Sequence, residues 1–82
     1  MEQNVIDILK KVLELDENIP IHADDKLKKY GLDSVSLVRV LLELESLYEI
    51  EIGDEDLKPE HFKTVASICL LLQIYLDEKD KR

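Results

Sequence analysis

The sequence is short of the residues on which several classes of protein depend. Its 82 residues include one cysteine, no tryptophan, two histidines and two glycines. A single cysteine cannot form an internal disulfide. Neither a nucleophile paired with a base nor a glycine-rich phosphate loop is recognisable. The cluster of His22, Asp24 and Asp25 lacks the ligand number and spacing of a metal site. The sequence therefore predicts a protein that is not an enzyme and holds no metal ion.

Long apolar runs and an excess of positive charge are also missing. The longest nearly apolar stretch, residues 68–76, contains Gln73 and is too short to span a bilayer. Acidic residues outnumber basic ones by 19 to 11, which gives a formal charge of −8. A nucleic-acid-binding protein needs the opposite balance. Residues 1–4 also do not resemble a signal peptide, so we expect a cytoplasmic protein. From the charge and the lack of a long apolar run we expect no nucleic-acid or membrane partner, and we further expect a monomer.

The periodicity of the apolar residues predicts one small all-helical domain over residues 1–82. Charged residues make up 37% of the chain and hydrophobic residues 45%, as in folded proteins. Helical spacing of apolar residues predicts three helices, at about 3–15, 34–48 and 64–77. One further helical turn is expected at about 54–58, and the charged tail from Asp77 is expected to fray.

The segment 34–48 carries two apolar faces. The broader face is the predicted core face. It consists of Leu37, Val40, Leu41, Leu44, Leu47 and Tyr48. A second stripe, formed by Val35, Val38 and Leu42, is rotated away from the first. This stripe either packs beneath the connection 19–32 or contacts partner proteins, and the pattern alone favours neither.

The last predicted helix shows a similar division between a core face and exposed apolar residues. Its predicted core positions are Val65, Ile68, Cys69, Leu72, Tyr75 and Leu76. Leu70 and Ile74 fall outside this face. Cys69 is interpreted as a small buried hydrophobic residue, because no histidine that could activate its thiol is near it in the sequence.

The start of the segment 34–48 is its most informative part. The chain reads Tyr-Gly-Leu-Asp-Ser-Val-Ser-Leu over residues 30–37. Asp33 is a favourable N-cap, which makes Ser34 the first helical residue. The Ser34 hydroxyl then lies at the positive end of the helix dipole, where an anion such as a phosphodiester is favoured. On capping chemistry alone, this is also how an ordinary helix begins.

In a small acidic helical chain, Gly31-Leu32-Asp33-Ser34-Val35 resembles the 4′-phosphopantetheine attachment motif of acyl and peptidyl carrier proteins. The resemblance extends from about Val5 to Leu76. It implies a four-helix bundle of the acyl-carrier-protein type with a short third helix. It also implies that a phosphopantetheinyl transferase attaches 4′-phosphopantetheine from coenzyme A to Ser34, and that partner enzymes load this arm with acyl or aminoacyl thioesters. The implied partner-binding residues are Asp33, Val35, Val38, Arg39 and Leu42.

The sequence departs from one branch of this family. Carriers of primary fatty-acid synthesis usually have acids at the positions held here by Ser36 and Arg39. The departure favours a specialised carrier with its own partners over the general carrier of primary fatty-acid synthesis. The length of the chain favours a free-standing carrier, and we expect an acyl carrier of fatty-acid, polyketide or related biosynthesis. The alternatives are an aminoacyl or peptidyl carrier of a nonribosomal-peptide type of pathway and, in a different class, an unmodified helical interaction module. The sequence identifies neither the cargo nor the partner enzymes.

Overall fold

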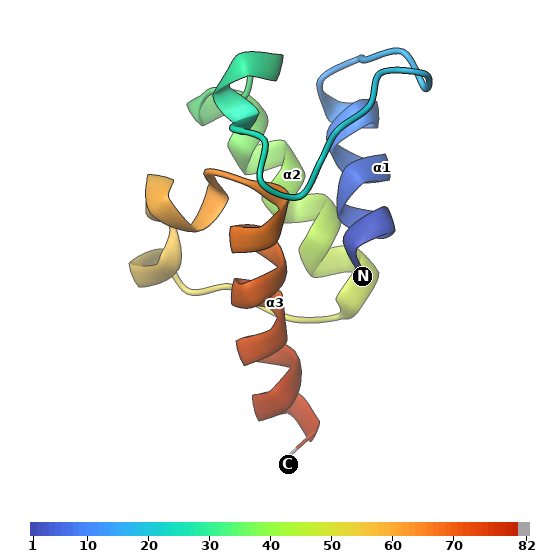
Figure 1. Ribbon diagram of the computed structural model, residues 1–82. Helices are drawn as coiled ribbons and strands as arrows, with labels where there is room; N and C mark the ends of the chain where they lie inside the picture. The colour runs from blue at the N-terminus through green and yellow to red at the C-terminus, as the bar shows by residue number, and fades with distance from the viewer. Residues whose placement is uncertain (81–82) are drawn as a thin grey trace.

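The computed structural model describes residues 1–80, which form three α-helices joined by connections that contain short 3-10 turns (Figure 1). The elements are α1 (Glu2–Val12), η1 (Leu27–Tyr30), α2 (Ser34–Tyr48), η2 (Asp54–Asp56), η3 (Pro59–Phe62) and α3 (Val65–Asp80). Over this range there is no β-strand, and the predicted all-α fold class is confirmed.

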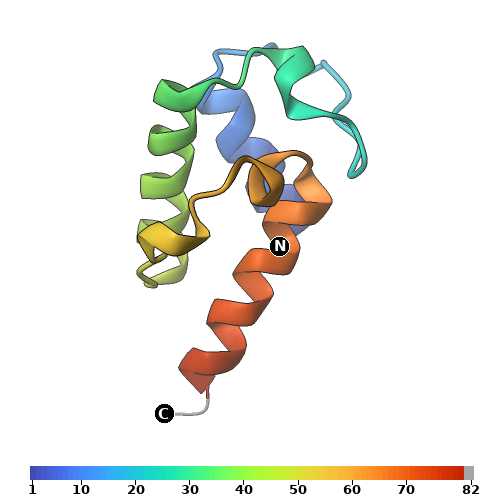
Figure 2. The same ribbon diagram turned by 90° about the vertical axis from the view of Figure 1, so that its left-hand side faces the viewer.

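The direction of the three helices brings the start of α2 to one end of the molecule. α1 packs against both α2 and α3, and it runs opposite to them (Figure 1). The last turns of α3 extend beyond the ends of the other two helices (Figure 2). Within residues 1–80, no helix is long and apolar enough to cross a membrane.

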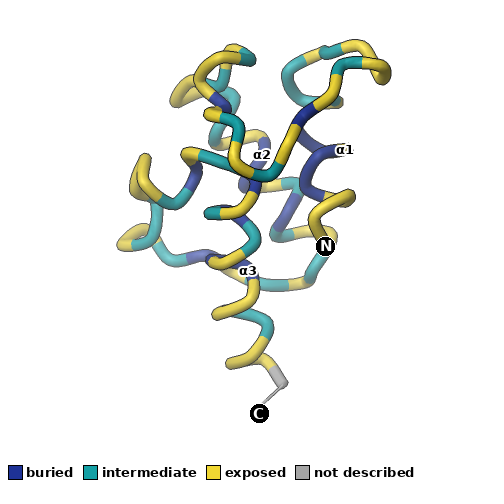
Figure 3. Tube along the Cα trace, viewed as in Figure 1, coloured by how far each residue is buried: buried dark blue, intermediate teal, exposed yellow. Residues whose placement is uncertain are grey.

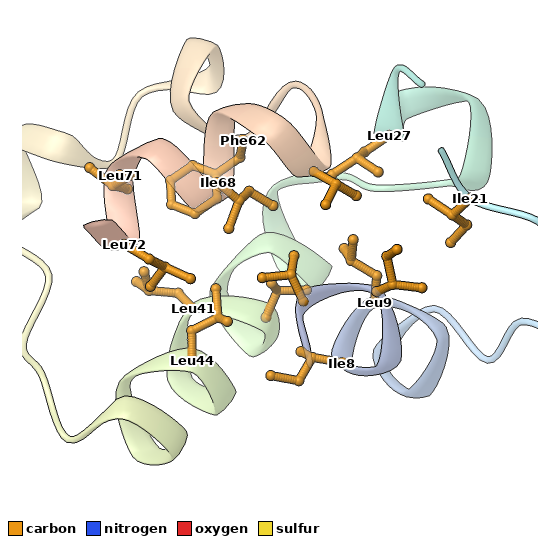
Figure 4. Close-up of a cluster of buried hydrophobic side chains, with 14 of the residues drawn as sticks. Ile8, Leu9, Ile21, Leu27, Leu41, Leu44, Phe62, Ile68, Leu71 and Leu72 are labelled. Atoms are coloured by element: carbon orange, nitrogen blue, oxygen red, sulfur yellow. The ribbon is translucent and has the colours of Figure 1, made fainter. Parts of the chain in front are cut away.

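The hydrophobic core draws on the connections as well as on the helices (Figure 4). Its buried side chains are Val5, Ile6, Ile8 and Leu9 of α1, Val40, Leu41 and Leu44 of α2, Val65, Ile68, Leu71 and Leu72 of α3, and Ile21, Leu27, Ile52 and Phe62 of the connections. Small domains bury a limited share of their surface, so each of these side chains matters to stability.

Three core predictions need correction. Leu47 is 52% exposed, although the sequence places it on the core face of α2. Leu71 is only 2% exposed and was not predicted as core. Residues 68–72 of α3 are apolar throughout, so their periodicity cannot select the buried face. Leu76 is only partly buried, because the last turns of α3 extend past α1 and α2 (Figure 3).

Helix α1 ends three residues before the predicted boundary at residue 15. Glu14 has a φ of 54°, in the left-handed region. The Leu15 N–H donates to the Lys10 carbonyl at 2.9 Å, and the Glu14 N–H donates to the Lys11 carbonyl at 3.4 Å. This pair of bonds forms a Schellman motif. Because the motif terminates the helix without a glycine, composition does not mark the boundary.

The predicted helical turn at 54–58 is replaced by the two 3-10 turns η2 and η3. Pro59 cannot donate a backbone hydrogen bond, so the chain starts a new turn there. The Tyr75 hydroxyl of α3 anchors this segment, since it accepts from the Gly53 N–H at 3.0 Å and donates to the Asp56 carboxylate. The short third helix of the predicted four-helix bundle is therefore a pair of 3-10 turns.

Helix α3 continues to Asp80, three residues beyond the predicted end at 77, so residues 77–80 of the expected frayed tail are helical. The Lys79 ammonium donates to the carbonyls of Tyr48 and Glu49 at 3.1 and 3.2 Å, which ties this part of α3 to the end of α2. The rest of the predicted tail, residues 81–82, lies outside the described residues.

Replacement of a core leucine tests this packing. Leu44 is completely buried, so Leu44→Ala should lower the free energy of unfolding by about 2–5 kcal/mol through lost contacts and a cavity. Leu70, which is 70% exposed, provides the control, and Leu70→Ala should change stability by less than about 0.5 kcal/mol. Urea denaturation measures both. Equal midpoints for Leu44→Ala and the parent would contradict the packing described.

Candidate functional site

The connection that leads into α2 is held by backbone hydrogen bonds to the end of η3 and to the start of α3. The Leu27 N–H donates to the Lys63 carbonyl at 2.9 Å, and the Ala66 N–H donates to the Ala23 carbonyl at the same distance. The Tyr30 hydroxyl lies near both the Pro20 carbonyl, at 3.1 Å, and an Asp25 carboxylate oxygen, at 2.8 Å. This long connection is thus an ordered support for the residues that follow it.

Gly31 turns the chain from η1 towards α2. Its φ is +96°, a conformation that residues with a Cβ rarely adopt. No heavy atom lies within 4 Å of the position a Cβ would occupy, so the backbone angle and not a close contact requires glycine. The Leu32 N–H donates back to the Leu27 carbonyl at 3.3 Å and closes the turn.

Asp33 caps α2 through a reciprocal pair of hydrogen bonds with Ser36. The Ser36 N–H donates to Asp33 Oδ1, and the Asp33 N–H donates to Ser36 Oγ, both at 2.9 Å. The Ser36 hydroxyl also lies 2.8 Å from Asp33 Oδ1. This is a capping box, which sequence reasoning missed because that motif usually has Glu or Gln at the third helical position. The Ser36 hydroxyl is therefore engaged inside the cap.

Ser34 occupies the first helical position and is exposed. Among the described residues, none forms a hydrogen bond with its Oγ, in contrast to Ser36. The position combines an accessible hydroxyl with the positive end of a 15-residue helix. A phosphodiester on this oxygen would lie at the positive end of the α2 dipole, so the residues present fit the phosphopantetheine group that the sequence suggests.

A cleft of about 760 Å³ opens beside Ser34. It lies between η1, the start of α2 and η3, which come from distant parts of the sequence. Its lining consists of Lys26, Lys28, Leu32, Asp33, Ser34, Leu37, Pro59, Glu60, Phe62 and Lys63. The sequence does not reveal this cleft, because its walls meet only after the connections have folded onto the helices.

The second apolar stripe of α2 is exposed to solvent. Val35, Val38 and Leu42 are 69%, 50% and 58% exposed, so the connection 19–32 does not cover them. Of the two readings left open by the sequence, packing beneath that connection is wrong. Arg39 is also exposed, and within residues 1–79 it forms no ion pair. Glu43 pairs with Lys11 at 3.1 Å, which leaves this part of α2 without a free acid.

The other reactive side chains are arranged for structure. Asp25 accepts from the His22 N–H at 2.9 Å, which assigns it to the support of the connection. Burial, followed by the charge of Glu2, raises the pKa of the half-buried Cys69 thiol, so its reactive thiolate form is disfavoured. Within the described part of the chain, no group of three or more His, Cys, Asp or Glu residues is placed to hold a metal ion.

The fold and the site together define the class of protein. An accessible serine at the start of a helix, whose Oγ forms no hydrogen bond with a base in the described part of the chain, has the geometry of a group that another enzyme modifies. The model of a family described as "Phosphopantetheine attachment site" matches residues 3–72. The chain belongs to this family, and it is a carrier rather than a catalyst.

Individual relatives agree with this assignment. The chain is 29% identical over 79 residues to an acyl carrier protein of Phytoplasma mali (strain AT), covering 95% of this chain and 90% of the relative. It is 31% identical over 68 residues to an acyl carrier protein of Syntrophobacter fumaroxidans (strain DSM 10017 / MPOB), covering 83% and 82%. For the chloroplastic acyl carrier protein 1 of Spinacia oleracea the identity is 31%, but the match covers only 53% of that protein and 92% of this chain.

Solved structures extend the similarity to the fold. The solution NMR structure of a holo acyl carrier protein from Nitrosomonas europaea has a TM-score of 0.84 and 28% identity, covering 93% of this chain and 95% of that one. A chain in the crystal structure of Bradyrhizobium japonicum glycine:[carrier protein] ligase complexed with glycylated carrier protein has a TM-score of 0.69 at 24% identity, covering 85% and 96%. The predicted family is confirmed, and with it a covalently attached phosphopantetheine.

The cap of α2 should give stability a specific pH dependence. Hydrogen bonds from the Ser36 N–H and then from its hydroxyl hold the pKa of Asp33 below the ordinary value of 3.8. A carboxyl with a lowered folded pKa contributes stability that is present above its unfolded pKa and is lost as the pH falls through the folded value. Asp33→Asn should therefore flatten the loss of stability below pH 3.8, since asparagine also caps helices but does not titrate.

Urea titrations between pH 2.5 and 7 measure this effect. The pKa of Asp25 is lowered by hydrogen bonds from the His22 N–H and the Tyr30 hydroxyl, so Asp25 should also contribute to the loss of stability in acid. This contribution should persist in the Asp33→Asn variant. Glu51→Gln is the control, because Glu51 is an exposed carboxylate outside the helix caps. Identical acid profiles for the parent and Asp33→Asn would refute the proposed contribution of Asp33.

Proposed function

We propose that this chain is an acyl carrier protein whose 4′-phosphopantetheine is attached to Ser34 and holds acyl groups as thioesters for partner enzymes. The observation that carries the proposal is the contrast between the two serines at the start of α2. Ser36 Oγ is bonded within the capping box, whereas Ser34 Oγ is exposed and forms no hydrogen bond within the described residues.

The attachment is a phosphoryl-type transfer. Ser34 Oγ attacks the phosphorus next to the pantetheine of coenzyme A, and the pyrophosphate P–O bond breaks, so that the adenosine bisphosphate leaves. The phosphopantetheinyl transferase takes up the Ser34 proton, because Asp33 is engaged in the cap and no group within residues 1–80 forms a hydrogen bond with Ser34 Oγ. Once attached, the group supplies a thiol on which an acyl group can be held as a thioester. The chain itself contributes an exposed oxygen at a favourable electrostatic position.

The proposed docking surface for partners is the exposed stripe Val35, Val38 and Leu42, together with Asp33 and Arg39. Exposed apolar residues that lie together commonly contact other proteins, and these begin one residue after Ser34. Arg39 and Asp33 carry opposite charges and Glu43 is paired with Lys11, so the surface has little net charge, although the chain as a whole carries −8. The matching partner surface is therefore apolar, with an acid opposite Arg39.

This surface supports a specialised role in fatty-acid, polyketide or related biosynthesis. The partners are then a phosphopantetheinyl transferase and acyl-activating and acyl-transferring enzymes. An aminoacyl or peptidyl cargo is the alternative. The family match counts against an unmodified interaction module. A cytoplasmic location stays a prediction, since the relatives include proteins described as chloroplastic. A monomeric state also stays a prediction.

Replacing each of the two serines with alanine tests which one carries the group. Incubation with coenzyme A and a broad-specificity transferase should add one phosphopantetheinyl group to the parent and to Ser36→Ala, but none to Ser34→Ala. Intact-mass spectrometry measures the gain. Ser34→Ala should remain fully folded, whereas Ser36→Ala should lose about 0.5–1 kcal/mol with its share of the capping box.

Two outcomes would defeat the assignment to Ser34. The first is a peptide map that places the group on Ser36. The second is a parent protein that gains no mass beside a known carrier modified in the same reaction. Circular dichroism of both variants excludes unfolding as the reason for a missing mass gain.

Charges placed on the exposed stripe test the docking surface. Val38→Asp and Leu42→Asp should leave the melting temperature nearly unchanged, because both side chains are at least half exposed. The value of kcat/KM for the transferase should fall by about five- to thirty-fold, since a charge is costly inside an apolar contact. Leu70→Asp, a charge on a comparably exposed leucine of α3, should not change turnover. Unfolding of both stripe variants would contradict the exposed positions of Val38 and Leu42, and unchanged turnover would refute the docking surface.

A further inference from the structure

The cleft beside Ser34 differs in charge from the rest of the chain. Three lysines line it, Lys26, Lys28 and Lys63, against two carboxylates, Asp33 and Glu60. Over the whole sequence, acids outnumber bases by 19 to 11. The cleft is therefore a locally positive region on a strongly acidic protein, next to the proposed attachment residue.

The three lysines are not used for internal ion pairs. Within residues 1–79, the lysines that pair with carboxylates are Lys11 and Lys79. The lysines of the cleft are exposed, so their ammonium groups are available to a ligand. Of the two acids, Asp33 is engaged by the N–H and hydroxyl groups of Ser36, which leaves Glu60 as the other carboxylate in the lining.

The interior of the cleft is apolar. Phe62 is 3% exposed, and Leu32 and Leu37 are partly buried members of the core surface, as is expected where a cleft reaches the core. An apolar interior with cationic side chains around it suits a short hydrocarbon chain with an anionic end. An acyl group with a terminal carboxylate has this form, whereas an aminoacyl group ends in an ammonium that the lysines repel.

We propose that this cleft receives the acyl group carried on the Ser34 arm and prefers an acyl group that ends in a carboxylate over a neutral one, and a neutral one over a cationic aminoacyl group. The inference rests on the proposed function, because the cargo must be tethered at Ser34. It adds a substrate class, ω-carboxyacyl thioesters, and it names Lys26, Lys28 and Lys63 as the residues that determine the preference.

Three cargoes of matched length test the preference: butyryl, succinyl and 3-aminopropionyl groups. Each is carried on an aminopantetheine arm, in which an amide replaces the labile thioester, and is transferred from the corresponding coenzyme A analogue. Amide chemical shifts of Leu32, Leu37 and Phe62 report how much of the cargo occupies the cleft. The ratio of occupied to open cleft should be about two- to five-fold higher for succinyl than for butyryl, and lower for 3-aminopropionyl.

Salt and lysine variants identify the cause of the difference. In 0.5 M NaCl the three cargoes should become similar, because the lysines are exposed and their charges are screened. The double variant with Lys28→Gln and Lys63→Gln should lose the succinyl preference and keep the butyryl occupancy. Lys58→Gln is the matched control, since Lys58 is an exposed lysine next to η3 that does not line the cleft.

The possible failures are distinguishable. If no analogue adds mass to the parent protein, the proposed function itself is wrong, and the inference falls with it. If all three cargoes are attached but shift the cleft amides equally at low salt, the attachment stands and the charge preference is wrong. If the lysine substitutions have an effect only when an acidic partner enzyme is added, the lysines form a protein-docking surface and the cargo preference is likewise refuted.

Discussion

The structure depends on apolar side chains that its connections supply to the core. Besides the buried side chains of the three helices, the core contains Ile21, Leu27, Ile52 and Phe62, which all come from the connections. Burial of Leu27 is combined with the hydrogen bond from its N–H to the Lys63 carbonyl, which joins the two long connections. Because these connections are packed rather than loose, the residues that follow them have defined positions.

This constraint explains how a small domain can present a long flexible group. The packed connection ends in the Gly31 turn and the Asp33 cap, so the start of α2 is held in place although Ser34 itself is exposed. The same closure brings η3 opposite α2 and forms the cleft beside Ser34. The proposed attachment residue, the proposed docking stripe and the charged cleft are thus three consequences of how the connections pack.

Local rules predicted much of the fold and part of the candidate site. The bounds of α2 follow from an N-cap and an amphipathic pattern, both of which act within a few residues. The end of α1 was missed because Glu14 adopts a left-handed conformation without the glycine that usually marks it. The role of Ser36 was missed because a serine at that position is ambiguous until its hydroxyl is seen to accept from the Asp33 N–H.

By itself, the sequence determined the helical class of the protein, the start of α2 and the motif around Ser34, because capping, periodicity and the order of residues in a motif are properties of neighbouring residues. Only the tertiary structure decided that Val35, Val38 and Leu42 are exposed, that Leu71 is buried and Leu47 is not, and that three lysines surround one cleft. Those outcomes depend on which distant segment covers each face of a helix. That choice is made by packing across the whole chain, and no local pattern contains it.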